Sequence, residues 1–187
     1  MDLVSADLKL RSFLKEDADA LVKLCNNINI WRNIRDALPH PYQLSDAHNF
    51  IQLATSKTPQ EIFAIDKKNE LVGCIGIHPQ DDVYRFSAEI GYWIGEPYWG
   101  QGLATAALQL IINYGFETLG MSKLYAGCFE FNKASQKVLV KAGFRREAIL
   151  KKAVFKNDSF YDEIRYAIFR DDDENKRWAK TLVIGQI

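Results

Sequence analysis

The sequence lacks an excess of charge of either sign. Its 187 residues include 24 Lys and Arg against 24 Asp and Glu, which gives a formal net charge of zero at pH 7. A protein that holds a nucleic-acid backbone needs a basic face, and this balance offers no broad one. We therefore expect no nucleic-acid partner.

Metal ligands and disulfide patterns are equally scarce. The three cysteines, Cys25, Cys74 and Cys128, are widely separated and have apolar neighbours, so we expect them to be buried thiols. There is no C-x-x-C pair, and the three histidines match neither H-E-x-x-H nor a zinc-finger spacing. We therefore expect no metal site.

Long hydrophobic runs are also missing. No stretch approaches the roughly 18 apolar residues that indicate a membrane span. Near the N-terminus, Asp2, Asp7 and Lys9 interrupt what would be the apolar core of a signal peptide. These absences favour a cytoplasmic protein without a membrane partner.

What is present is typical of one globular domain. Hydrophobic residues make up 48% of the chain, and a chain of this length can bury roughly 70% of the surface that its unfolded form exposes. No linker or internal repeat divides the sequence. We predict a single domain over residues 1–187.

Apolar periodicity predicts mostly helices in the first third of the chain. A strand at about 7–13 is followed by a helix at 16–26 and by a helix-like pattern at 28–38. The segment PHPY at 39–42 predicts a loop, because proline lacks an amide hydrogen and restricts the residue before it. Ser45 can then cap a helix that runs to about residue 57.

Strands are more frequent in the rest of the chain. Residues 61–67 and 71–78 predict a hairpin, and the apolar stretch 86–95 predicts a strand in the centre of the sheet. A helix at 102–119 and a strand at 122–130 complete a β-α-β unit. A helix at 133–142, which ends at Gly143, and strands at about 145–154 and 160–169 follow.

A glycine-rich segment, GEPYWGQGLAT at 95–105, joins the predicted central strand to the next helix. Free amides at a helix start, with no side chain at Gly100 or Gly102 to block close approach, suit a phosphate or pyrophosphate. A plain tight turn is the alternative. Gln101 and Gly102 stand where a P-loop needs Lys and Ser or Thr, and Thr105 stands at the third glycine of the dinucleotide pattern. Neither of those motifs is therefore present.

On these segments the sequence resembles the GNAT superfamily of acyl-CoA-dependent N-acetyltransferases, and most of all its RimJ/RimL branch. The resemblance covers nearly the whole chain. Its parts are PHPY at 39–42, DA at 46–47, FI at 50–51, AEIGYWI at 88–94, YWGQGLAT at 98–105 and residues 132–144.

The resemblance implies an α/β (α+β) fold, in which a mixed central sheet is flanked by helices and two splayed strands hold the pantetheine arm of acetyl-CoA. It also implies that the pyrophosphate lies on the amides of residues 100–105, and that a strand amide polarises the thioester carbonyl. The residues it assigns to the cofactor are Trp93, Ile94, Gly95, Gly100, Gln101, Gly102, Leu103, Ala104, Thr105 and Asn132.

Acetyl transfer to an amine needs a neutral amine, a polarised thioester and a proton for the departing thiolate. Glu89 is the only carboxylate within the apolar stretch 86–95, and burying a charge without a partner is costly. We predict that Glu89 lines the catalytic site as a general base. Two alternatives are an ion pair with an Arg or Lys, and binding of the incoming ammonium without removal of its proton.

The proton donor is less evident. Many GNAT enzymes carry a tyrosine seven residues after the Asn that opens the last helix, and here that position is Leu139. The departure directs attention to Ser135, in an Asn132-x-x-Ser135 pattern that resembles the Rim-type enzymes. Ser135 in the first helical turn could give its proton to the thiolate, directly or through water. The alternative is that Asn132 and Ser135 only cap the helix.

Two acidic segments are weaker candidates. Asp162 resembles a recurrent acidic position of the branch, but neighbouring Asp158 and Glu163 suggest a solvated strand end. The run at 171–174 is interpreted as solvated chain or the start of a terminal helix.

These observations predict an enzyme that transfers the acetyl group of acetyl-CoA to a primary amine, most of all the α-amine of a protein N-terminus. A small amine, a polyamine or an antibiotic is an alternative acceptor, and a CoA-binding module without turnover is an alternative function. The loop at 37–46 and the strand tip at about 156–160 are expected on the acceptor side. Aromatic residues near Tyr161 and Trp178 make a homodimer conceivable.

Overall fold

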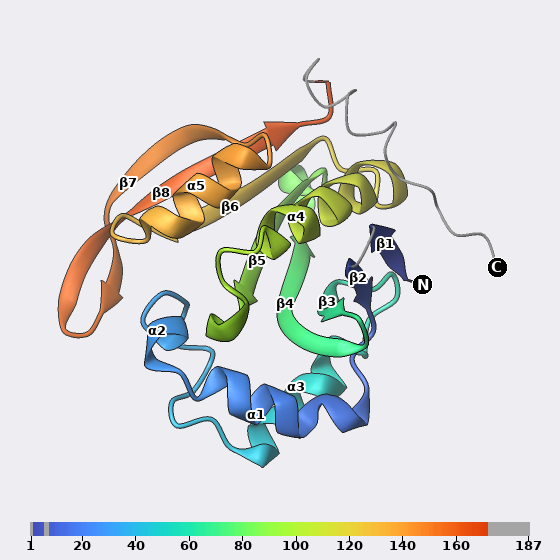
Figure 1. Ribbon diagram of the computed structural model, residues 1–187. Coiled ribbons are helices and arrows are strands. Elements are labelled where there is room, and N and C mark those ends of the chain that lie inside the picture. The colour runs from blue at the N-terminus through green and yellow to red at the C-terminus, as the bar shows by residue number, and fades with distance from the viewer. Residues whose placement is uncertain (1, 6–7, 172–187) are drawn as a thin grey trace.

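The computed structural model describes residues 2–5 and 8–171, which form one eight-stranded sheet with helices on both faces (Figure 1). The strand order is β1-β2-β3-β4-β5-β6-β8-β7. The strands are β1 (Leu3–Ser5), β2 (Leu8–Arg11), β3 (Ile62–Lys67), β4 (Glu70–Pro79), β5 (Ser87–Ile94), β6 (Lys123–Phe129), β7 (Arg145–Lys156) and β8 (Ser159–Phe169).

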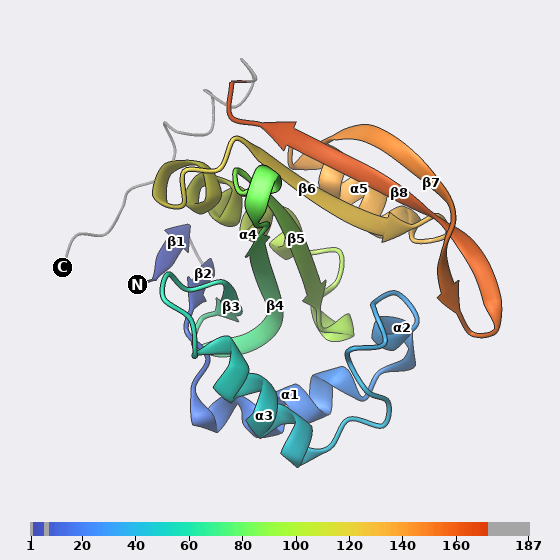
Figure 2. The same cartoon turned by 180° about the vertical axis from the view of Figure 1, so that it is seen from behind.

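The helices lie in two groups, which Figure 2 shows from behind. They are α1 (Ala18–Cys25), α2 (Ile28–Trp31), α3 (Leu44–Ala54), α4 (Leu103–Asn113) and α5 (Lys133–Lys141), with short helices η1 (Lys15–Asp17), η2 (Asp82–Tyr84), η3 (Glu96–Tyr98) and a π-helical turn η4 (Tyr114–Thr118). Among the described residues, no helix is long and apolar enough to cross a membrane.

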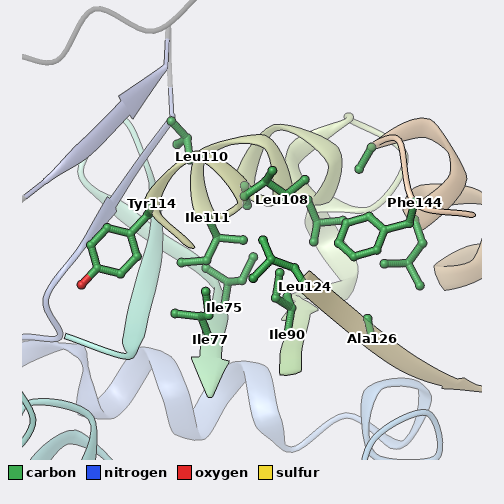
Figure 3. Packing of buried hydrophobic residues seen from close by; sticks show 14 of the residues in the cluster. Ile75, Ile77, Ile90, Leu108, Leu110, Ile111, Tyr114, Leu124, Ala126 and Phe144 are labelled. Atoms are coloured by element: carbon green, nitrogen blue, oxygen red, sulfur yellow. The ribbon is translucent and has the colours of Figure 1, made fainter. Parts of the chain in front are cut away.

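Alternation along the central strands divides the core between the two faces of the sheet. Ile75, Ile77 and Ile90 point to the face covered by α4 and α5, as Figure 3 shows. Cys74 and Trp93 belong to a second cluster with α1 and α3. Because successive side chains of a strand point to opposite faces, the position of each β5 residue decides which layer it meets. We call these the α4/α5 face and the α1/α3 face.

The sheet is antiparallel except where β5 meets β6. These two strands pair in parallel over only three positions, the last of which sets Glu89 opposite Tyr125. Beyond that point β5 continues to Ile94 beside β4, while β6 continues beside β8, and the two strands diverge (Figure 1). We call this separation, between residues 90–94 of β5 and 126–129 of β6, the splay. The predicted mixed sheet with splayed strands is therefore confirmed.

Two predictions for the N-terminal third are wrong. The helix expected at 28–38 ends at Trp31, where the amides of Asn33 and Ile34 donate to the carbonyls three residues earlier and the chain tightens into turns. Beyond these turns, Arg35 and Asp36 form ion pairs with Glu89 and Lys156. The helix expected after Ser45 begins one residue before it, at Leu44, and Asp46 accepts a hydrogen bond from the backbone amide of Gln43 at 2.8 Å.

Other boundaries changed less. The helix expected at 102–119 consists of α4 and the η4 turn, and the opening strand became β2, preceded by a short β1. Residue 7 of that strand, most of the acidic run at 171–174 and Trp178 lie outside the described residues.

Candidate active site

The glycine segment after β5 forms an open helix start. Gly100 and Gly102 have φ angles of +75° and +77°, in the left-handed region that side chains disfavour. Gly102 is the N-cap of the eleven-residue helix α4, and a Cβ built at either glycine would meet no atom within 4 Å. The loop is thus open at both glycines, directly before a helical turn whose amides have no intrahelical partner, and this arrangement fits a phosphate or pyrophosphate.

Neighbouring side chains hold this loop in place. The Trp99 indole N–H donates to the Ile94 carbonyl at 2.7 Å, and the Lys67 ammonium donates to the Gln101 side-chain oxygen at 2.7 Å. Leu103 is buried and anchors the start of α4 in the core. Lys67 thus brings a positive charge to the loop, which favours an anion there. Ala104 and Thr105, the next two predicted contacts, are half-buried in the first turn.

Backbone direction in β5 separates the other predicted cofactor contacts. The Gly95 amide donates to the Val72 carbonyl of β4 at 2.8 Å. In an antiparallel ladder, alternate residues direct both backbone groups to the same partner strand. Trp93 therefore also faces β4, whereas Tyr92 and Ile94 direct their amides and carbonyls toward the splay.

Of the three residues expected to offer backbone groups to the pantetheine, Ile94 alone directs them toward the splay. The Trp93 side chain packs among the residues of the α1/α3 face. The structure adds Tyr92, which the sequence analysis did not assign. The register with β4 could not be read from the sequence, and it decides this assignment.

Glu89 lies at the apex of the splay, on the α1/α3 face. Its neighbours in register are His78 on β4 and Tyr125 on β6, and its carboxylate pairs with the Arg35 guanidinium. The Glu89 side chain is 21% exposed and the Arg35 side chain 68% exposed. The ion pair considered in the sequence analysis is therefore formed, by a cation that solvent or a ligand can reach.

The surroundings of Glu89 on this face include a histidine and an open position. Burial lowers the pKa of His78, while the carboxylates of Glu61 and Glu89 act in the opposite direction. Gly91 follows Glu89 on the same face, and a Cβ there would meet no atom within 4 Å. The space next to the carboxylate is thus open for an acceptor group.

Ser135 lies on the other side of the sheet, in the first turn of α5. The Asn132 side chain accepts a hydrogen bond from the Ser135 amide at 3.0 Å, so Asn132 is the cap of this helix. The Ser135 hydroxyl lies 2.9 Å from the hydroxyl oxygen of Tyr92. Leu139, where many relatives of the resembled family carry tyrosine, is fully buried in the core.

Two connections hold the strand tip at residues 153–161. Asp162 accepts hydrogen bonds from the Lys151 ammonium at 2.8 Å and the Lys152 amide at 2.9 Å, and these contacts lower its pKa. They fix an irregular section of β7, where Lys152 has a φ of +52°. Farther along, Lys156 is buried over the Trp31 ring, 3.7 Å from its centroid, and pairs with Asp36. Asp162 thus supports the fold of the tip.

The cysteines are free and buried, as predicted. Burial raises the pKa of Cys25 to about 12, and that of Cys128 to about 12. Within residues 2–5 and 8–171, no group of three or more His, Cys, Asp or Glu side chains could hold a metal ion.

Comparison with known proteins places this geometry in a family. The model of the acetyltransferase (GNAT) domain matches residues 7–145. The chain belongs to the GNAT acetyltransferase family. It is 30% identical over 168 residues to a Bacillus subtilis (strain 168) protein named uncharacterized N-acetyltransferase YoaA, covering 87% of this chain and 93% of that protein.

One further relative and one solved structure are similar to this chain. The Escherichia coli (strain K12) ribosomal-protein-serine acetyltransferase is 35% identical over 107 residues, covering 57% of this GNAT chain and 59% of that protein. A structure described as RimL, a ribosomal L7/L12 alpha-N-protein acetyltransferase in complex with coenzyme A, has a TM-score of 0.81 at 23% identity and covers 92% of this chain and 100% of that chain. The latter likeness shows the fold.

Proposed function

We propose that this GNAT protein transfers the acetyl group of acetyl-CoA to the α-amine of a protein N-terminus. The observation that supports the chemistry best is the arrangement around the splay. The anion-binding helix start lies at the end of β5, Glu89 lies at the apex on one face, and Ser135 lies on the other face. The name of the ribosomal-protein-serine acetyltransferase relative supports a protein acceptor.

The cofactor would be held mainly by backbone groups. The first-turn amides of α4, with Gly100, Gln101 and Gly102 before them, would bind the pyrophosphate, and Lys67 adds a positive charge. The amides of Tyr92 and Ile94 and the carbonyl of Tyr92 would pair with the pantetheine arm, as a neighbouring strand would, while the Ile94 carbonyl accepts from the Trp99 indole. One of these two amides would stabilise the charge that develops on the thioester oxygen.

The side chains of Glu89 and Ser135 would handle the protons. Glu89 would receive the ammonium in place of Arg35 and remove its proton, so that the neutral amine attacks. Ser135 would give its hydroxyl proton to the departing sulfur on the opposite face. Asn132 contributes by fixing the backbone of Ser135.

A screen for turnover tests the function. The protein is incubated with acetyl-CoA and a mixed library of peptides, polyamines and small amines, and free thiol and acetylated products are measured. We expect thiol release that depends on the amine, and a peptide acetylated at its α-amine. Acetylation of small amines alone would overturn the protein acceptor, and tight CoA binding with no thiol release would support the non-catalytic module.

Glu89→Gln and Ser135→Ala should slow turnover by about 10² to 10⁴, the usual contribution of general acid or base catalysis, without weakening CoA binding. If Glu89 is the base, the deficit of Glu89→Gln should shrink as pH rises and the free amine becomes common. If Glu89 only binds the ammonium, the substitution should raise the KM of the amine with little change in kcat. A loss below about threefold for Ser135→Ala would show that water protonates the sulfur.

A further inference from the structure

A hydrogen bond between two hydroxyl groups crosses the splay. Tyr92 comes from β5, whereas Ser135 comes from α5, which packs against β6, β7 and α4. The two hydroxyl oxygens lie 2.9 Å apart, and the Tyr92 oxygen is 3.4 Å from the Ser135 carbonyl oxygen. The hydroxyl contact has the usual O–H···O length, and the carbonyl contact is longer.

Either hydroxyl can be the donor in the shorter contact, and the Ser135 carbonyl is a second, more distant acceptor for the Tyr92 proton. Burial raises the pKa of Tyr92, and the nearby Cys128 thiol acts in the same direction, whereas the hydrogen bond with Ser135 opposes the shift. The phenol therefore stays neutral throughout the range in which an enzyme of this kind works. A phenol has one proton to donate. When Tyr92 donates it to Ser135, the Ser135 proton is free to point elsewhere.

Without such a donor, a serine hydroxyl near a helix start tends to bond to the backbone carbonyl three or four residues earlier, which for Ser135 is that of Asn132 or Phe131. That orientation would consume the proton that the chemistry requires. The backbone of Ser135 is already fixed by Asn132, whose side chain accepts from the Ser135 amide at 3.0 Å. Tyr92 and Asn132 thus constrain Ser135 from two elements of the fold.

We propose that Tyr92 is a positioning residue, which holds the Ser135 hydroxyl so that its proton is directed at the departing sulfur. This inference rests on the proposed function. As Ser135 gives up its proton, the O–H bond breaks and an S–H bond forms, and negative charge grows on the Ser135 oxygen. The hydrogen bond from Tyr92 strengthens as that charge develops. Water returns a proton to Ser135 after the products leave.

Tyr92→Phe tests this role because it removes only the hydroxyl. We expect kcat to fall about tenfold, the effect of losing one hydrogen bond to a charged group. The KM for acetyl-CoA should stay within about twofold, because the backbone of Tyr92 is unchanged. Tyr114→Phe is the matched control: Tyr114 is buried and its hydroxyl donates to the Gln60 carbonyl at 2.8 Å, beyond the C-terminal end of α4. Its kcat should not change.

A double substitution separates positioning from a merely structural effect. If Tyr92 acts through Ser135, Ser135→Ala with Tyr92→Phe should have the same kcat as Ser135→Ala alone. The solvent deuterium isotope effect on kcat should also be larger in Tyr92→Phe than in the wild type, because proton delivery has become slower.

If the wild type is active, either of two results would overturn the role of Tyr92. One is a Tyr92→Phe enzyme with the kcat of the wild type. The other is a double variant whose loss of kcat equals the product of the two single losses. A wild-type protein that acetylates no amine would overturn both this role and the proposed function. A melting temperature of Tyr92→Phe close to that of Tyr114→Phe shows that the comparison is made on folded protein.

Discussion

Gly102 and Gly120 offer a matched pair for testing the cofactor loop. Gly102 has a φ of +77° and Gly120 a φ of +69°, and a Cβ at either position would meet no atom within 4 Å. They lie at opposite ends of α4 and η4. At about 1.5 Å per residue, this helical stretch separates them by roughly 24 Å. Gly102→Val and Gly120→Val therefore impose the same backbone strain, but only the first alters the helix start.

The strain of a β-branched residue in the left-handed region costs about 1–3 kcal/mol. In a domain of this size, 1 kcal/mol lowers the melting temperature by about 2–4 °C, so both variants should melt about 2–12 °C below the wild type. At Gly102 the valine side chain would also occupy the space in front of the first-turn amides. Losing one hydrogen bond to a charged phosphate costs about 1.5–3 kcal/mol. We expect the Kd for CoA to rise about 10- to 150-fold.

Calorimetric titration of CoA into each folded variant measures this effect, and thermal melts of the same samples measure the strain. Gly120→Val should bind CoA as the wild type does. Equal CoA affinities in the two variants would show that the Gly102 loop does not contact the cofactor, whatever their stabilities.

Two other substitutions test the surroundings of the site. Arg35→Gln should lower the KM for the amine up to about fivefold without changing CoA affinity, because the exposed Arg35 competes for the Glu89 carboxylate. Initial rates over a range of amine concentrations measure this KM. A higher KM in the variant would mean that Arg35 itself binds the acceptor. Arg11→Met should destabilise the fold by about 3–5 kcal/mol in urea titrations, because it leaves the buried carboxylates of Asp17 and Asp66 unpaired. A loss below about 1 kcal/mol would show that both carboxylates find other partners.

The sequence was sufficient to predict the order of most strands and helices. The hairpin of β3 and β4, the central position of β5 and the stop of α5 near Gly143 were predicted from local patterns, and all are confirmed. Gly143 has a φ of +97°, which explains why a glycine ends this helix. Such features depend on side-chain periodicity and on the backbone freedom of glycine, which are properties of short segments.

The misplaced predictions depend on contacts between distant segments. The helical pattern at 28–38 ends in turns after Trp31, and Arg35 and Asp36 beyond them find ionic partners on β5 and β7. The sequence analysis expected the backbone of Trp93 to face the splay, whereas the backbone of Tyr92 does so. This difference follows from the register of β5 on β4. Periodicity shows that neighbouring residues face opposite ways, but it does not show which of them faces the splay.

The contact between Tyr92 and Ser135 was missed for the same reason. The two residues are 43 positions apart, and nothing local links a tyrosine on a strand to a serine on a later helix. The observation that the usual tyrosine position is Leu139 did direct attention to Ser135. The buried Leu139 shows that the core occupies this position.

In the proposed mechanism, the arrangement of the sheet would let one site use a base and an acid without mutual neutralisation. Glu89 and Tyr92 are three residues apart on β5, so their side chains point to opposite faces. The carboxylate is therefore on the α1/α3 face with Arg35 and His78, and the hydroxyl pair is on the α4/α5 face. In that mechanism, a proton taken from the amine would stay on the acceptor side, while the proton for the sulfur would come from the other side. The two faces of the sheet are connected at the splay, because β5 and β6 stop pairing directly after Glu89.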